Sequence, residues 1–242
     1  MISNVHHAMG TVFTFLIIDE EKSKSQIEAA ISFACAEIDR LDNQFSLWKQ
    51  DSELTLFNRG EIEHPSPLFI EVMQECERAK TITAGHFDPW ALGKRFDPTG
   101  LVKGWSAKRA LSILIEAGIQ GGLVNAGGDI CVVPGRIYTI GVQDPFKPGE
   151  LLGVVDVTEA VATSGSYERG DHITSVKGLP ITTVAATVLG TDLTRLDAIA
   201  TALIAGGAEV LGMVTKMRGT EAMIVKSDGS MLASPNFAFS KG

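Results

Sequence analysis

The sequence is poor in cysteine, and its few thiols are not spaced for a shared site. Cys35, Cys76 and Cys131 are an odd number, lie far apart and form no Cys-x-x-Cys pair. A disulfide framework needs paired cysteines, and a thiolate zinc site needs closely spaced ones. Both are disfavoured, so we expect three buried thiols in a reducing compartment.

Positive charge is scarce too. The 242 residues include 21 Lys and Arg against 29 Asp and Glu, which gives a formal net charge of −8. Proteins that bind nucleic acids or adhere to anionic membranes present a basic surface instead. We therefore expect no nucleic-acid partner and no electrostatic adhesion to a membrane.

Long hydrophobic runs are also missing. The apolar stretch 11–18 is short, no Lys or Arg precedes it, and no small-residue cleavage site follows it. It therefore lacks both flanks of a secretory signal. No run approaches the roughly 18 apolar residues of a transmembrane helix. These absences predict no membrane insertion and a cytoplasmic location.

The composition is that of a globular protein, with 45% hydrophobic and 21% charged residues. After a strand over 11–18, helical periodicity dominates the first half. Ser66 followed by Pro67 is a good helix start, and Asp51-Ser52 can cap a short helix. We expect helices over 24–44, after 51–52, over 66–81 and over 106–117, with an irregular segment over 85–104.

The second half favours strands. Its apolar runs predict strands over 122–125, 130–134, 137–143, 153–163 and 182–189, and helices over 193–205 and 209–217. A turn at 227–230 predicts a hairpin between 221–226 and 231–233. This segregation predicts an α+β fold with a helix-rich N-terminal half and a strand-rich C-terminal half. We expect one domain over 1–242, or two subdomains that meet near 118–125.

Asp197 and Thr201 form the first candidate site. If residues 193–205 are helical, these two side chains at i and i+4 share a face. A carboxylate and a hydroxyl on one face suit a hard cation such as Mg²⁺. A partly buried polar pair on a helix rich in alanine is the structural alternative, and the pair alone does not decide between them.

Residues 96–104, which read FDPTGLVKG, form a second candidate. Their glycines are misplaced for a Walker loop or a dinucleotide-binding fingerprint. Lys103 could contact a phosphate, and Asp97 could accept a hydrogen bond from a nucleotide base or ribose. A tight turn with a solvated Lys103 is the alternative.

Other segments carry weaker signals. Residues 125–129 form a turn or a backbone nest for an anion, and 163–169 form a surface turn or a phosphate contact. The aromatic residues within 45–48 and 85–89 either stack on a ring system or pack in the core. His172 could act as a base near neutral pH or serve only the structure.

Taken in order, these segments resemble the ApbE family, the FAD:protein FMN transferases. The matching segments are 9–11, 45–58, 85–89, 97–105, 125–129, 163–169, 171–173 and 196–203. The resemblance implies an ApbE-like fold and an enzyme that binds Mg²⁺ and FAD, the latter as its substrate. Such an enzyme cleaves the pyrophosphate, joins FMN through a phosphoester to Ser or Thr of a target flavoprotein, and releases AMP.

The resemblance also implies the site residues. Asp197, Thr201 and the backbone carbonyl of Gly100 would be metal ligands, and Lys103 would act beside the nucleotide. The positions that match FAD contacts are Met9, Trp48, His86, Phe87, Asp88, Asp97, Lys103 and Ile173.

The general base is suggested by chemistry more than by the resemblance. The acceptor hydroxyl must lose its proton as it attacks, and we expect His172 to take it, with Asp171 or Asp129 as second choices. Two other functions stay open. One is a Mg²⁺-dependent FAD pyrophosphatase that gives FMN and AMP, and the other is a flavin-binding protein without turnover.

Overall fold

The structure, a computed structural model, describes residues 1–165 and 181–240. Its helices are α1 (Lys24–Phe45), α2 (Glu53–Asn58), α3 (Pro67–Ile82), α4 (Thr99–Glu116) and α6 (Leu193–Val214). Its strands are β1 (Ile2–Ala8), β2 (Thr11–Ile17), β3 (Gly122–Ala126), β4 (Asp129–Val132), β5 (Tyr138–Gln143), β6 (Leu151–Val157), β7 (Ala160–Gly165), β8 (Thr183–Gly190), β9 (Glu221–Lys226) and β10 (Met231–Ala233).

Local capping explains where the first helices begin. The hydroxyls of Ser23, Ser52 and Ser66 each accept a backbone N–H from the first turn of the helix that follows. Such a bond satisfies one of the N–H groups that a helix start leaves without a partner. The helix starts predicted after 51–52 and at 66 are confirmed.

One antiparallel sheet organises the chain. Eight strands pair in the order β1-β2-β3-β4-β7-β8-β9-β10, and β5 and β6 form a separate pair. Strand β2 of the first half pairs with β3 of the second, with Phe15 opposite Val124. The two halves of the sequence therefore share one sheet.

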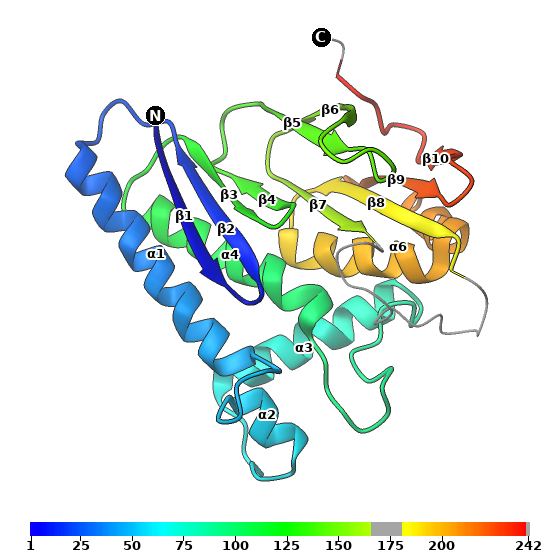
Figure 1. The fold of residues 1–242 in the computed structure, drawn as a ribbon, viewed down its shortest axis with the longest axis horizontal. Helices are drawn as coiled ribbons and strands as arrows, with labels where there is room; N and C mark the ends of the chain where they lie inside the picture. The colour runs from blue at the N-terminus through cyan, green and yellow to red at the C-terminus, as the bar shows by residue number, and fades with distance from the viewer. Residues whose placement is uncertain (166–180, 241–242) are drawn as a thin grey trace.

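Side chains alternate between the two faces of this sheet. On β9, Ala222 and Ile224 point into the core formed with the helices, whereas Met223 and Val225 belong to a second core with β5 and β6. A strand buried on both faces has this continuous apolar character. The layers are thus helices, the eight-stranded sheet, and the β5–β6 hairpin (Figure 1). The predicted α+β class is confirmed.

Helix α6 covers the part of the sheet formed by β7, β8 and β9 (Figure 1). It packs against α4, β7, β8 and β9, and Ala198, Ala200 and Ala202 are fully buried. By length and composition alone this helix is apolar enough to cross a membrane, although Arg195, Asp197 and Glu209 interrupt its apolar residues. Its position in the core accounts for that apolar character.

The irregular segment predicted over 85–104 is wrong at its end, because α4 begins at Thr99 rather than at 106. Its start lacks a side-chain cap and contains Gly100 and Gly104, which oppose helix formation. Burial of Leu101, Gly104 and Trp105 overrides that local preference. Tertiary packing, invisible in the local pattern, sets this boundary.

Three other boundaries differ from the prediction. Strand β1 was not predicted; it pairs with β2 although its side chains are mostly exposed. The single strand expected over 153–163 is two strands, β6 and β7, which belong to different sheets. The two helices expected over 193–205 and 209–217 are present as the two parts of α6, which the non-helical Gly207 (φ 52°, ψ −126°) separates, but the second part ends at Val214 rather than at 217.

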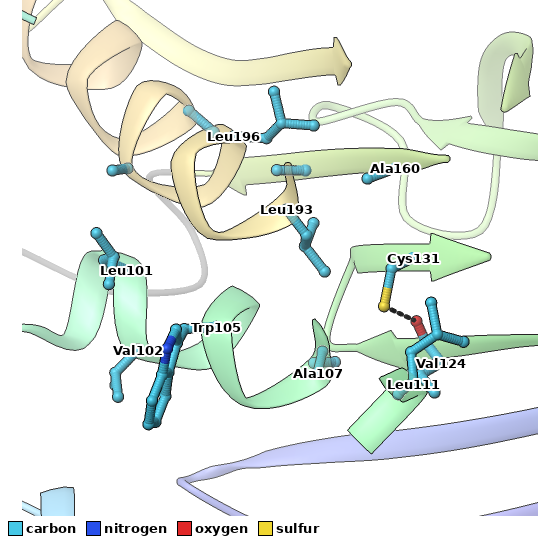
Figure 2. Packing of buried hydrophobic residues seen from close by; sticks show 14 of the residues in the cluster. Leu101, Val102, Trp105, Ala107, Leu111, Val124, Cys131, Ala160, Leu193 and Leu196 are labelled. Carbon is cyan, nitrogen blue, oxygen red and sulfur yellow. Dashed lines mark hydrogen bonds between the residues drawn. The ribbon is translucent and has the colours of Figure 1, made fainter. Parts of the chain in front are cut away.

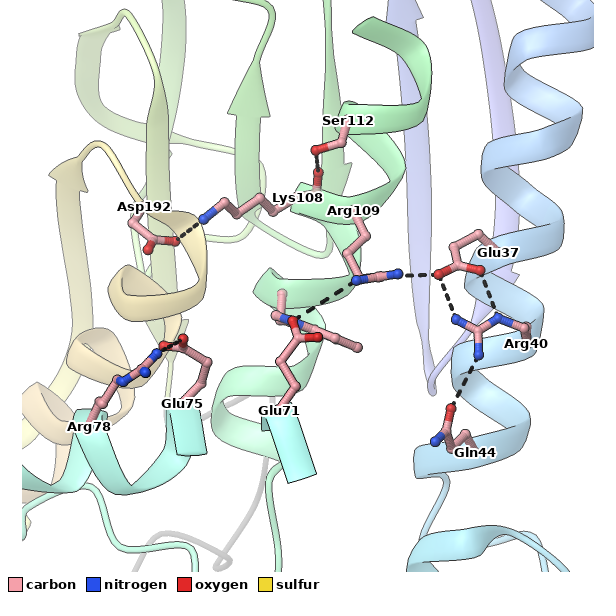
Figure 3. A network of polar contacts seen from close by, with 11 residues as sticks. Glu37, Arg40, Gln44, Glu71, Glu75, Arg78, Lys108, Arg109, Ser112 and Asp192 are labelled. Carbon is pink, nitrogen blue, oxygen red and sulfur yellow. Dashed lines mark hydrogen bonds and ion pairs between the residues drawn. The ribbon is translucent and has the colours of Figure 1, made fainter. Parts of the chain in front are cut away.

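A polar network ties the helices together at their surface. Arg109 of α4 donates to Glu37 of α1 (3.1 Å) and lies 4.0 Å from Glu71 of α3, while Arg40 also pairs with Glu37 (Figure 3). Lys108 reaches Asp192, the residue that caps α6. Helix α4 is therefore held from both sides.

Candidate functional site

The N-terminal halves of α4 and α6 approach each other at two glycines of α4. A Cβ placed on Gly104 would lie 2.8 Å from the backbone oxygen of Leu193 and 2.9 Å from Cβ of Asp197. A Cβ on Gly100 would lie 3.0 Å from Oγ1 of Thr201. Two glycines at i and i+4 on α4 thus face the i and i+4 pair on α6. Figure 2 shows the apolar core around this contact, including Leu193.

This contact gathers the three predicted metal ligands. Asp197 is fully buried, and its Oδ2 accepts the backbone N–H of Gly104 at 2.9 Å. One turn along, Oγ1 of Thr201 lies 3.5 Å from the carbonyl oxygen of Gly100. The arrangement brings a carboxylate, a hydroxyl and a carbonyl oxygen to one helix crossing.

The donor set fits Mg²⁺. All three groups are hard oxygen donors, which this ion prefers. Within residues 1–165 and 181–240, no group of three His, Cys, Asp or Glu side chains lies close enough to share a metal ion. A cation at this crossing would therefore depend on one carboxylate together with neutral oxygens and the ligand's own oxygens, as Mg²⁺ sites beside phosphates do.

Lys103 lies next to this contact and forms a buried ion pair. Its Nζ is 2.7 Å from Oδ2 of Asp129, and the two side chains are 12% and 0% exposed. The other carboxylate oxygen accepts the N–H of Thr163 at 3.1 Å. Oγ1 of Thr163 in turn donates to the carbonyl of Gly128. The predicted segments 97–105 and 125–129 and the start of 163–169 therefore meet.

His86 and Phe87 lie along α6. A Cβ on Gly100 would be 3.1 Å from Cε2 of Phe87, so this buried ring borders the predicted metal ligands. His86 is 7% exposed, with Nε2 3.6 Å from Oε1 of Glu209. Its ring occupies the space that a side chain at Gly206 would need. Both residues lie beside the same helix as Asp197.

The carboxylates of Asp88 and Asp97 bind residues that are close to them in the sequence. Asp88 pairs with Lys80 at 2.9 Å and accepts the N–H of Trp90. Asp97 accepts both the N–H and the hydroxyl of Thr99, the first residue of α4. Asp97 therefore orders the entry into the helix that carries Gly100 and Lys103.

Met9 and Trp48 are tied to the end of α1. The carboxylate of Asp42 accepts the N–H of Met9 at 3.0 Å and pairs with Lys49, the residue after Trp48. Met9 has a positive φ of 52°, and the ring of Trp48 is 84% exposed. One carboxylate thus links two segments predicted to contact FAD.

Sequence reasoning missed Asp42 and Gly104 as site residues. Asp42 gave no signal, because its partners lie far away in sequence and on other elements. The spacing of Gly100 and Gly104 did carry a signal, since glycines at i and i+4 in a helix mark a close approach. The predicted site residues His172 and Ile173, and Asp171, lie outside the described residues.

The three cysteines, all of them among the described residues, are free thiols and form no cluster. Cys76 and Cys131 are fully buried. Burial raises the pKa of these two thiols far above its ordinary value, so they stay neutral. Cys35 is half-buried, and burial raises its pKa as well. The prediction of three buried thiols therefore holds for Cys76 and Cys131 but not for Cys35, which is only partly buried.

Known proteins resemble this chain along most of its length. The model of the ApbE family matches residues 9–93 and 92–224. An FAD:protein FMN transferase of Rhodobacter capsulatus is 31% identical over 157 residues, 58% of this chain. One of Klebsiella pneumoniae (strain 342) is 32% identical over 79 residues, 32% of this chain. The matched parts span only 30% and 24% of those two relatives.

Solved structures share the fold. The ApbE protein from Thermotoga maritima superposes with a TM-score of 0.80 at 20% identity, covering 97% of each chain. The flavin transferase ApbE from Vibrio cholerae gives a TM-score of 0.76 at 20% identity, covering 98% of this chain and 97% of its own. This likeness extends to the whole architecture.

Proposed function

This chain belongs to the ApbE family, and on that premise we propose that it is a Mg²⁺-dependent FAD:protein FMN transferase. The acceptor is a Ser or Thr hydroxyl of a target flavoprotein. Its oxygen forms a bond to the FMN phosphorus, the bond to the bridging pyrophosphate oxygen breaks, and AMP leaves. The observation that carries the proposal is the crossing of α4 and α6. Asp197 and Thr201 of α6 contact Gly104 and Gly100 of α4 there, and Lys103 lies between these two glycines in the sequence.

Asp197, Thr201 and the carbonyl of Gly100 would hold the Mg²⁺. When bound, the ion would neutralise charge on the pyrophosphate. The chain's own residues hold these oxygen atoms in position. The N–H of Gly104 fixes one oxygen of Asp197, and the missing side chains at Gly100 and Gly104 allow the helices to meet at this distance.

Lys103 contributes a second positive charge. Its ammonium is held by Asp129, which is itself fixed by the N–H of Thr163. A cation placed before substrate arrives needs little reorganisation when negative charge moves to the leaving phosphate. We assign Asp129 to holding Lys103 and not to proton removal, because Oδ1 accepts the N–H of Thr163 and Oδ2 forms the ion pair with Lys103.

The remaining groups bind FAD in this proposal. Phe87 and His86 border α6, Asp88 and Asp97 flank the loop that enters α4, and Met9 and Trp48 stand at the end of α1. Ile173 and the base His172 complete the set from the sequence. Ring stacking on an exposed indole suits Trp48, which is the most exposed aromatic of the group.

The test follows the fate of FAD. Purified protein is incubated with FAD and either Mg²⁺ or a chelator, with and without a flavoprotein domain that a family member already modifies. Free AMP and free FMN are then quantified. The proposal expects AMP only with Mg²⁺ and acceptor present, and little free FMN. Equal amounts of free FMN and AMP without acceptor would make the protein an FAD pyrophosphatase. If FAD is not consumed under any condition, the protein would be a flavin-binding protein without turnover.

A further inference from the structure

A cationic cavity lies between α2 and the loop that leads into α4. Its volume is about 480 Å³, and its lining includes Arg59, Lys94 and Arg95 together with Leu47 and Leu92. None of the described residues that line it is Asp or Glu. The cavity therefore collects positive charge in a chain whose net charge is −8.

These cations are available to a ligand. Lys94 and Arg95 are exposed, and within the described part of the chain neither forms an ion pair. The guanidinium of Arg59 donates only to neutral oxygens of Gln50, one on its backbone and one on its side chain. Three positive side chains facing one cavity create a local potential that attracts an anion.

The walls of the cavity are fixed by hydrogen bonds. Asn58 donates to the carbonyl of Phe96 at 2.9 Å and accepts the N–H of the same residue at 2.7 Å. Phe96 is buried and packs edge-on against Phe57 of α2. The loop with Lys94 and Arg95 is thus anchored to α2 at Phe96, the residue after Arg95.

Part of the cavity lining is apolar. Leu92 is 52% exposed and lines the cavity together with the partly buried Leu47. A lone phosphate would leave these surfaces in water and would use only the cations. An extended peptide with acidic and apolar side chains would use both, because charged groups give orientation and buried apolar area gives affinity.

We propose that this cavity docks an acidic, partly apolar segment of the protein that accepts FMN. The inference rests on the proposed function, since it names the partner of the same reaction. The loop that carries Lys94 and Arg95 continues through Asp97 into α4, which bears Gly100 and Lys103. The loop that would hold the segment is therefore only a few residues along the chain from Gly100 and Lys103. These cations would also attract an acidic segment of the partner, although this chain carries a negative net charge.

The experiment reverses charge in the cavity. Steady-state transfer to the acceptor domain is measured for wild type and for Lys94→Glu/Arg95→Glu. A second double variant, Lys216→Glu/Arg218→Glu, makes the same charge change at exposed positions beyond α6. We expect the cavity variant to raise KM for the acceptor about tenfold, with kcat and KM for FAD within about twofold. The control variant should leave all three constants near wild type.

A binding measurement separates this proposal from the proposed function. Fluorescence anisotropy follows a labelled peptide of glutamate, leucine and serine, and its glutamine counterpart. Tighter binding of the glutamate peptide by wild type than by the cavity variant supports the docking site, whether or not transfer occurs. A rise in KM for FAD alone would overturn it, because the cavity would then belong to the nucleotide. Equal losses in both double variants, or no preference between the peptides, would overturn it too.

Discussion

At the scale of single residues, the buried pair of Lys103 and Asp129 supports both structure and activity. Asp129→Asn leaves the ammonium facing a neutral amide at a position where the lysine side chain is 12% exposed. We expect a loss of about 3 kcal/mol in the free energy of unfolding, measured by urea titration. Removing both charges in Lys103→Met/Asp129→Asn should restore much of that stability. A double variant as unstable as the single one would contradict this account.

Replacing Asp197 should slow the reaction more than replacing Thr201. Asp197→Ala removes a charged ligand, so we expect Mg²⁺-dependent AMP release to fall about 10²-fold or more, which corresponds to several kcal/mol. Thr201→Ala removes a neutral oxygen and should cost about tenfold. Because Asp197 also accepts the N–H of Gly104, Asp197→Asn is the control that keeps this hydrogen bond. The same Mg²⁺ dependence in all variants would refute the ligand assignment.

The proposed base His172 predicts a pH dependence. A base must be neutral to accept the acceptor proton, so the rate should fall as the pH drops through a histidine pKa of about 6.5. His172→Ala should flatten this acidic limb and slow transfer by roughly 10²–10⁴-fold, with FAD affinity changed far less. The measurement is the pH profile of kcat for both proteins. If the acidic limb is unchanged in His172→Ala, or if only FAD affinity is lost, a group other than His172 removes the acceptor proton.

At the scale of helices and strands, the contact of α1 with α4 depends on Glu37. Hydrogen bonds from Arg40 and Arg109 hold the pKa of this carboxyl below its ordinary value of 4.5. A pKa lowered in the folded state stabilises the fold above the ordinary value, and the gain is lost as the pH falls through the lowered pKa. Figure 3 shows Glu37 between its two arginines.

Glu37→Gln should therefore cost about 1 kcal/mol at neutral pH, since both arginines are partly exposed. The deficit should shrink towards zero in strong acid. Urea unfolding at neutral and acidic pH measures it. Glu28→Gln is the matched control on the same helix, where an exposed pair with Lys24 should contribute well under about 1 kcal/mol. If Glu37→Gln is equally destabilised in acid, the loss in the free energy of unfolding comes from packing and not from the charge of Glu37.

Replacing glycine by alanine should have opposite effects on stability at Gly104 of α4 and at Gly212 of α6. A methyl group at Gly104 meets backbone and side-chain atoms within 3 Å, so Gly104→Ala should destabilise the protein by about 1–3 kcal/mol and displace Asp197. A methyl group at Gly212 meets nothing within 4 Å. Gly212→Ala should stabilise α6 by about 0.5–1 kcal/mol. Thermal unfolding of both variants checks the contrast, and equal shifts would contradict the close approach of the two helices.

The sequence predicted well what depends on neighbouring residues. Ser52 and Ser66 cap helices where the pattern indicated, because capping involves only the next turn. It failed at Thr99, where α4 begins against its local propensity because α6 and the sheet bury it. The Lys103–Asp129 pair was not foreseen either, although both residues were noticed, since residues 26 positions apart meet only through the sheet.

At the scale of the whole molecule, the site depends on both halves of the chain. Gly100 and Lys103 come from the helix-rich half, whereas Asp129, Asp197 and Thr201 come from the strand-rich half. The sheet joins these halves through β2 and β3 (Figure 1). Each motif is ambiguous in the sequence because its partners are distant, and the order of the motifs carried more information than any one of them.

The most direct test of the central claim is the intact mass of the acceptor. A flavoprotein domain that a family member modifies is incubated with this protein, FAD and Mg²⁺. The account predicts that the acceptor gains one FMN with loss of water, that the modification maps to a Ser or Thr, and that Asp197→Asn abolishes it. An acceptor of unchanged mass beside accumulating free FMN and AMP would contradict the account.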